Sequence, residues 1–138
     1  MARLQTISKD EVRERAATAR THCELAELAL PSPREYEASA GAQAAASNAI
    51  LAGIAAADAI CGHASGQRSS GPDHKEAVAL LASVRPDGPT LSKKLSRLLA
   101  NKTLLQYGGF CTRAVAAEMI GCAQDLIEGL DKRLPPAR

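Results

Sequence analysis

The sequence predicts an all-α fold, an antiparallel bundle of four long helices and one short helix. Apolar residues recur at intervals of three and four along most of the chain, and no segment alternates apolar and polar residues as a strand would. Aromatic residues make up only 2% of the chain, so the core must be built from Ala, Leu, Ile and Val, which favours closely packed helices. The length of 138 residues fits one domain, with flexible ends expected at residues 1–7 and 134–138.

The first helix is predicted from Lys9 to Leu30. Ser8 and Glu11 have the spacing of a capping box, in which each side chain binds the backbone amide of the other residue. The Pro-Ser-Pro segment that follows ends the helix. One buried stripe is expected on this helix, formed by Val12, Ala16, Ala19, Cys23, Ala26 and Leu30.

The second helix is predicted from Glu35 to about His63, after a cap at Ser32. It is largely alanine and carries no charge between Glu37 and Asp58. A helix that is apolar on nearly all sides is surrounded by others, so this one is predicted to be the central helix. Its apolar run is shorter than the ~20 residues of a membrane span, and no span is expected. The scattered cysteines and the lack of a signal sequence indicate a cytoplasmic protein.

Residues 62–73 are rich in turn-forming residues and are predicted to form a loop. Three further helices are expected beyond it. Pro72 favours the start of the short one, and Gly108-Gly109 favours the end of the next one. The predicted bounds are residues 72–84, then 90 or 92 to 107, then 111 or 112 to 133.

Asp58 interrupts the apolar part of the second helix. A carboxylate in such surroundings is costly unless a cation or several hydrogen-bond donors neutralise it. The candidate partners lie beyond the following turn: Arg68, His74 and Lys102. The alternative is that Asp58 faces a solvent-filled groove near the end of the helix.

Composition gives little indication of a ligand. A net charge of +2 neither argues for a nucleic-acid surface nor excludes RNA. His22-Cys23 and Cys61-Gly62-His63 lack the second ligand pair that a structural zinc site needs, so no metal ion is expected. No glycine-rich phosphate loop, nucleophile elbow or HExxH motif is present, and no cofactor is predicted.

Arg68 and His74 are the candidate catalytic residues, with five residues between them. A neutral His can remove the proton of a ribose 2′-hydroxyl, and an Arg can stabilise the charge that develops on the attacked phosphate. These two roles suffice for RNA cleavage without a metal ion. The structural alternative is that Arg68 pairs with Asp58, while His74 lies in the first turn of the third helix, exposed or bound to a backbone group.

Four segments of the chain combine helix ends with polar residues in one pattern. They are Ala55 to Cys61, Gly66 to Arg68, Asp73-His74 followed by Ala77 to Leu81, and Leu95 to Leu99 followed by Lys102 and Gln106-Tyr107. This pattern extends over roughly residues 36–128 and resembles the HEPN (higher eukaryote and prokaryote nucleotide-binding) superfamily of small helical proteins.

The resemblance implies an antiparallel helical bundle, often a homodimer, and frequently the toxin half of a toxin–antitoxin pair whose partner is a small nucleotidyltransferase. Many HEPN proteins are metal-independent ribonucleases, in which an Arg and a His separated by four to six residues line a cleft between protomers. Arg68 and His74 match this spacing, while Ser69 follows Arg68 and the motif precedes the third helix.

The resemblance also implies roles for individual residues. His74 is the expected general base and Arg68 the cation that stabilises the phosphate, with supporting residues Asp58, Lys102 and Tyr107. Other proteins with a similar loop bind only nucleotides or partner proteins. A non-enzymatic dimerisation or nucleotide-binding module is therefore the alternative function.

Overall fold

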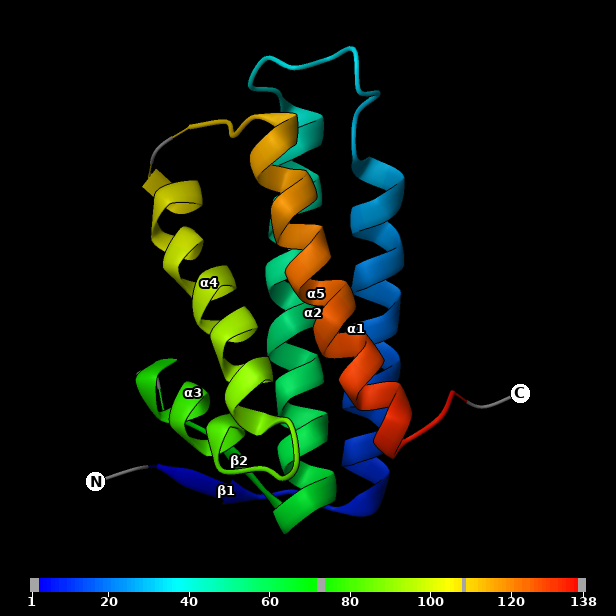
Figure 1. Cartoon of the computed structure of the whole chain (residues 1–138), viewed down its shortest axis with the longest axis vertical. Helices are drawn as coiled ribbons and strands as arrows, with labels where there is room; N and C mark the ends of the chain where they lie inside the picture. Colours follow the sequence, from blue (N-terminus) through cyan, green and yellow to red (C-terminus); the bar gives the residue numbers. More distant parts are fainter. Residues whose placement is uncertain (1–2, 72–73, 108, 137–138) are drawn as a thin grey trace.

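The computed structural model describes residues 3–71, 74–107 and 109–136, without the side chains of residues 103, 104, 106 and 107. This part of the chain forms four long helices, one short helix and a two-stranded sheet, which confirms the all-α class. The long helices run in alternating directions, and the sheet lies at one end of the bundle (Figure 1). The elements are β1 (Leu4–Thr6), α1 (Lys9–Ala29), α2 (Ala40–Ser65), β2 (Gln67–Ser69), α3 (His74–Ala82), α4 (Gly88–Tyr107) and α5 (Arg113–Arg133).

Helix α1 begins where the sequence predicted. The Ser8 hydroxyl accepts a hydrogen bond from the Glu11 amide at 3.1 Å, and the Glu11 carboxylate accepts one from the Ser8 amide at 3.2 Å. The helix ends at Ala29, one residue before the predicted end, and Leu30 is its C-terminal cap. Leu30, the last residue of the predicted stripe, is half-buried, and the other five are buried as predicted: Val12, Ala16, Ala19, Cys23 and Ala26.

Helix α2 begins at Ala40, so the predicted start at Glu35 was wrong. The effective cap is Ser39, whose hydroxyl accepts from the Ala42 amide at 3.1 Å. Ser32 forms only a local turn, and residues 32–38 are exposed. A helix placed there would have no apolar face to bury, and tertiary packing supplies most of the stability of a helix.

The role of α2 as the central helix is confirmed. It packs against α1, α4 and α5, and most of its residues are buried (Figure 1). By length and composition α2 could cross a membrane, but its apolar window is mostly covered by the other helices. Such burial is typical of a helix in the core of a bundle. The small alanine side chains allow the neighbouring helices to approach closely.

The small sheet was not predicted. Strands β1 and β2 are antiparallel and pair Leu4 with Ser69, Gln5 with Arg68 and Thr6 with Gln67. Each strand has three residues, too few for an apolar and polar alternation to be recognisable in the sequence. Residues 4–6, expected at a flexible end, therefore pair with a segment expected to be a loop.

The connection between α3 and α4 lies two residues earlier in the chain than predicted. Helix α4 begins at Gly88, two residues before the earliest predicted cap, and α3 ends at Ala82. A Cβ atom on Gly88 would lie 2.5 Å from the Leu81 carbonyl oxygen, so this close approach requires glycine. The predicted start of α3, residues 72 and 73, lies outside the described residues. Helix α5 begins as predicted, because the Thr112 hydroxyl accepts from the Val115 amide at 3.3 Å.

Candidate functional site

Asp58 is the centre of an ion-pair cluster at the end of the bundle that carries the sheet. Only 7% of the residue is exposed. Its Oδ2 atom accepts a hydrogen bond from Arg15 Nη2 at 3.0 Å and lies 3.6 Å from Arg68 Nη1. Arg15 comes from α1 and Arg68 from β2, so the carboxylate joins three elements. The predicted pairing of Asp58 with Arg68 is present, whereas Arg15 was not anticipated.

The electrostatics of Asp58 are set mainly by burial. Removal from water disfavours the charged form and raises the pKa of Asp58, while the guanidinium groups of Arg15 and Arg68 act in the opposite direction. The net shift of the pKa is upward. The two Arg side chains therefore offset only part of the cost of burying the Asp58 carboxylate. The position of Asp58 between them fits a structural role in holding both guanidinium groups in place.

Arg68 has a second partner. Its Nη2 atom donates a hydrogen bond to the Gln5 side-chain oxygen at 3.1 Å, and Gln5 is also its neighbour across the sheet. The adjoining cavity of about 190 Å³ is lined by Arg15, Arg68, Ile7 and two acidic residues, Glu11 and Glu14. This cavity is smaller than the ~300 Å³ of typical ligand sites. Within one chain, Arg68 therefore has a structural role.

His74 lies at a different cavity. It is the first residue of α3, it is exposed, and its Nε2 atom lies 3.5 Å from the Nζ atom of Lys102 on α4. At this distance the ammonium can donate to a neutral imidazole. The cavity has a volume of about 600 Å³ and is lined by His74, Lys75, Val78, Ala79, Ser96, Leu99 and Ala100.

The predicted site residues therefore form two pairs. Asp58 contacts Arg68, and His74 contacts Lys102. No hydrogen bond or ion pair joins one pair to the other among the described residues, and Arg68 and His74 line different cavities. The arrangement of Arg68 and His74 matches the structural alternative considered from the sequence. The side chain of Tyr107 lies outside the described residues.

Two further polar residues of α2, Gln43 and Asn48, have structural partners. Gln43 donates to the Leu105 carbonyl oxygen at 2.9 Å and accepts from the Cys111 amide at 3.2 Å, which ties α2 to the ends of α4 and α5. The side chain of Asn48 lies 3.0 Å from the Nδ1 atom of His22. These side chains satisfy buried or half-buried hydrogen-bonding groups, as expected inside a bundle.

Two buried cysteines are poor nucleophiles. Burial, together with neighbouring carboxylates, raises the pKa of Cys23 and of Cys61 to about 12. Both thiols are therefore protonated at neutral pH, and thiolate chemistry is not available to them.

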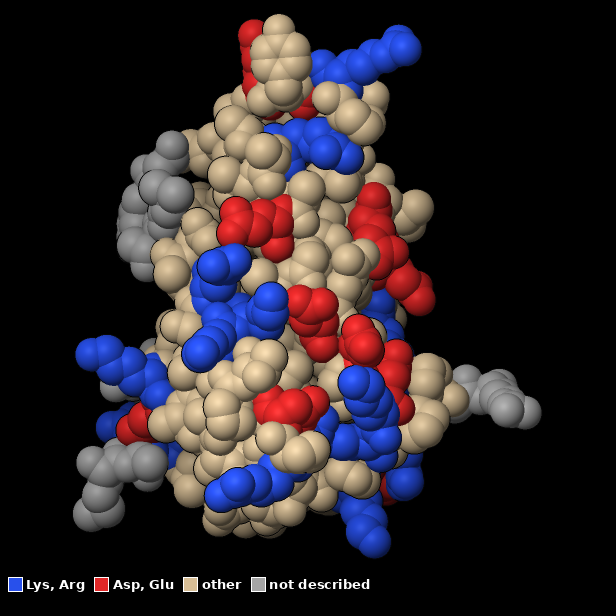
Figure 2. Space-filling view, viewed as in Figure 1, with Lys and Arg blue, Asp and Glu red and all other residues tan. Residues whose placement is uncertain are grey.

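Surface charge is mixed on the face formed by α1, α4 and α5. Acidic and basic side chains alternate there (Figure 2), and ion pairs such as Lys94–Asp125 and Arg97–Glu118, both at 3.2 Å, join α4 to α5. A broad nucleic-acid surface usually needs clustered cations. This face is therefore unsuited to contact RNA.

Comparison with protein-family models, with curated proteins and with solved structures finds no match for this chain. The fold defines an all-α protein of the helical-bundle type.

Proposed function

We propose that this chain is a HEPN-like protein that binds RNA and cleaves it without a metal ion. The observation that supports this best is the contact between His74 Nε2 and Lys102 Nζ at 3.5 Å, because His74 also lines a cavity of about 600 Å³. An imidazole can accept the 2′-hydroxyl proton, and an adjacent ammonium can bind the phosphate. Val78 and Leu99 offer an apolar surface for a nucleobase.

Cleavage also needs the Arg68 guanidinium, which contacts Asp58 and Gln5 and makes no hydrogen bond to His74 within the described part of one chain. We therefore infer a composite site in a homodimer, in which Arg68 of one protomer approaches His74 of the other. Asp58 fixes the guanidinium, and Lys102 orients the imidazole. The supporting role of Tyr107 rests only on the resemblance to the HEPN superfamily.

A groove beside the His74–Lys102 pair suits such a dimer. It has a volume of about 400 Å³, lies between α2 and α4, and includes Lys102. Leu51 in this groove is 48% exposed, although it belongs to the central helix. A second copy bound there would cover this apolar surface and bring its own residues next to Lys102. The groove is lined by Gln43, Ser47, Ile50, Leu51, Ile54, Lys102 and Leu105.

The proposal extends to a toxin–antitoxin pair with a small nucleotidyltransferase as antitoxin, a partner that rests on the HEPN resemblance. A non-enzymatic dimerisation or nucleotide-binding module is the second candidate. The observation in its favour is the double attachment of Arg68 to Asp58 and Gln5, which gives this guanidinium a complete structural role.

The experiment is cleavage of labelled single-stranded RNA by purified protein in EDTA. The wild type should cleave, and His74→Ala should lower the rate by at least ~100-fold, the contribution of a general base. His22→Gln is the matched control, because His22 contacts Asn48 on another part of the bundle. Both variants should unfold at the urea concentration of the wild type.

The same preparations separate the two candidates. RNA left intact by concentrated wild type excludes the ribonuclease, and equal cleavage by His74→Ala excludes His74 as the base. Fluorescence anisotropy with labelled RNA or nucleotide then tests binding without cleavage, the outcome that the second candidate predicts.

A further inference from the structure

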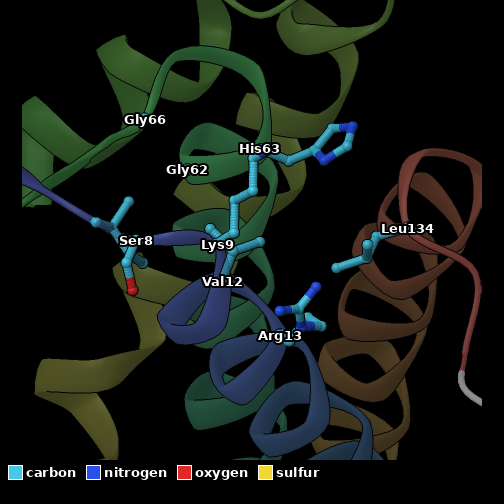
Figure 3. Close-up of a pocket in the computed structure, with 9 residues that line it drawn as sticks. Ser8, Lys9, Val12, Arg13, Gly62, His63, Gly66 and Leu134 are labelled. Carbon is cyan, nitrogen blue, oxygen red and sulfur yellow. The ribbon is translucent and has the colours of Figure 1, made fainter.

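Another cavity, which His74 does not line, lies at the end of the bundle that carries the sheet. It forms where the start of α1, the end of α2 and the residue after α5 meet (Figure 3). Its volume is about 650 Å³, within the ~300–1,000 Å³ of small-molecule sites. It is lined by Ile7, Ser8, Lys9, Val12, Arg13, Gly62, His63, Gly66 and Leu134.

The charged residues that line this cavity are all basic. Lys9 and Arg13 come from α1, His63 comes from α2, and no acidic residue is among the nine lining residues. Neither the Lys9 nor the His63 side chain has a hydrogen bond or ion pair within the described part of the chain. Arg13 pairs with Asp10, but a guanidinium has five N–H groups and retains donors for a ligand.

The rest of the lining is apolar or open. Ile7 and Val12 are buried core residues, and the half-buried Leu134 side chain points into the hollow that Lys9, Arg13 and His63 surround (Figure 3). Gly66 has the left-handed conformation with φ +72°. A Cβ atom added there would meet nothing within 4 Å, so this edge of the cavity is open. Three basic side chains, those of Lys9 and His63 without a partner among the described residues, therefore lie beside an apolar wall.

We propose that this cavity binds a small organic anion, a carboxylate or a phosphate attached to a short apolar body. The head group binds Lys9, Arg13 and His63 through charge-assisted hydrogen bonds, which are about twice as strong as neutral ones. The apolar body packs against Ile7, Val12 and Leu134. This inference does not rest on the proposed action on RNA.

The test is isothermal titration calorimetry of the full chain with octanoate, octyl phosphate and 1-octanol. Octanoate or octyl phosphate should bind, and neutral 1-octanol should bind at least ~10-fold more weakly. Preference for one of the two anions identifies the head group. Failure of both anions to bind, or equal binding of 1-octanol, would overturn the proposal.

Variants locate the binding in this cavity. Lys9→Met should weaken binding of the anion at least ~10-fold, and Lys9→Arg should retain it. Lys93→Met removes the same charge from an exposed position on α4 and should leave the affinity unchanged. Equal losses in Lys9→Met and Lys93→Met would show a general charge effect and contradict the site.

Discussion

Arg15 Nη2 lies 3.0 Å from Asp58 Oδ2, a contact between α1 and α2 that spans 43 positions of the chain. Arg68 approaches the same oxygen at 3.6 Å from β2. One buried carboxylate therefore connects the first helix, the central helix and the sheet. The side chains of Arg15 and Arg68 are 33% and 31% exposed, so water as well as Asp58 stabilises their charges.

Replacing Asp58 by Ala should destabilise the protein by about 2 kcal/mol. This value lies between the ~0–1 kcal/mol of exposed pairs and the ~3–5 kcal/mol lost when a buried charge is left without its partner. The Arg15 Nε atom is already buried without a hydrogen-bond partner, so Arg15 is poorly placed to find a replacement. Urea denaturation measures the change, with Asp10→Ala in an exposed pair as control. Equal, small effects of both variants would refute the structural role of Asp58.

Stability should respond to pH in opposite senses at two aspartates. Burial raises the pKa of Asp58 above its ordinary 3.8, so the folded state binds this proton at a pH where the unfolded chain does not. The contribution of Asp58 to the free energy of unfolding therefore rises as pH falls from its folded-state pKa to 3.8. The Arg133 hydrogen bond lowers the pKa of Asp87, whose contribution is complete above 3.8 and is lost as pH falls below it.

Asp58→Asn and Asp87→Asn isolate these contributions when unfolding free energies are measured from roughly pH 7 to pH 3. The stability of the wild type relative to Asp58→Asn should increase on acidification above 3.8. Its stability relative to Asp87→Asn should decrease below 3.8. If the stability of the wild type relative to Asp58→Asn instead decreased on acidification above 3.8, the two neighbouring Arg side chains would affect the pKa of Asp58 more than burial does.

Two glycine substitutions should have opposite effects on stability. A Cβ atom on Gly88 would lie 2.5 Å from the Leu81 carbonyl oxygen, so Gly88→Ala must displace backbone and should cost about 1–3 kcal/mol. Gly121 lies inside α5 with nothing within 4 Å of a Cβ atom, and Gly121→Ala should stabilise by about 0.5–1 kcal/mol. Thermal and urea unfolding test both. Stabilisation by Gly88→Ala would contradict the close approach at the α3–α4 connection.

Cysteine reactivity should follow burial. Cys111 is half-buried, whereas Cys23, Cys61 and Cys122 are buried. Because only a thiolate reacts readily, iodoacetamide should modify Cys111 first in the native protein and the other three mainly after unfolding. Mass spectrometry of timed samples gives the order. Early modification of Cys61, whose pKa is raised to about 12, would show that α2 opens locally.

The central position of α2 was predictable, because a run of uncharged residues before Asp58 leaves a helix no face for solvent. Its start was not predictable. Ser32 and Ser39 both suit a cap, and only tertiary packing selects Ser39. The sheet escaped prediction for a related reason, since its three-residue strands are joined by a contact between distant parts of the chain.

The sequence could predict which residue types form the candidate site, but not how those residues are arranged in space. The need of Asp58 for a cation followed from its apolar surroundings, and Arg68 was among the expected partners. Arg15 borders the buried stripe of α1, and no local pattern links it to a residue 43 positions away. The separation of Arg68 from His74 depends on where β2 and α3 pack, which spacing alone does not determine.

Complementation between two altered protomers tests the composite ribonuclease site most directly. Arg68→Gln and His74→Ala should each be inactive alone on single-stranded RNA in EDTA. Each mixed dimer would contain one intact site and one doubly altered site. Random assortment makes half of the dimers mixed, so unfolding and refolding the variants together should restore roughly a quarter of wild-type cleavage. A mixture as inactive as its components, or a wild type that leaves RNA intact, would contradict the account.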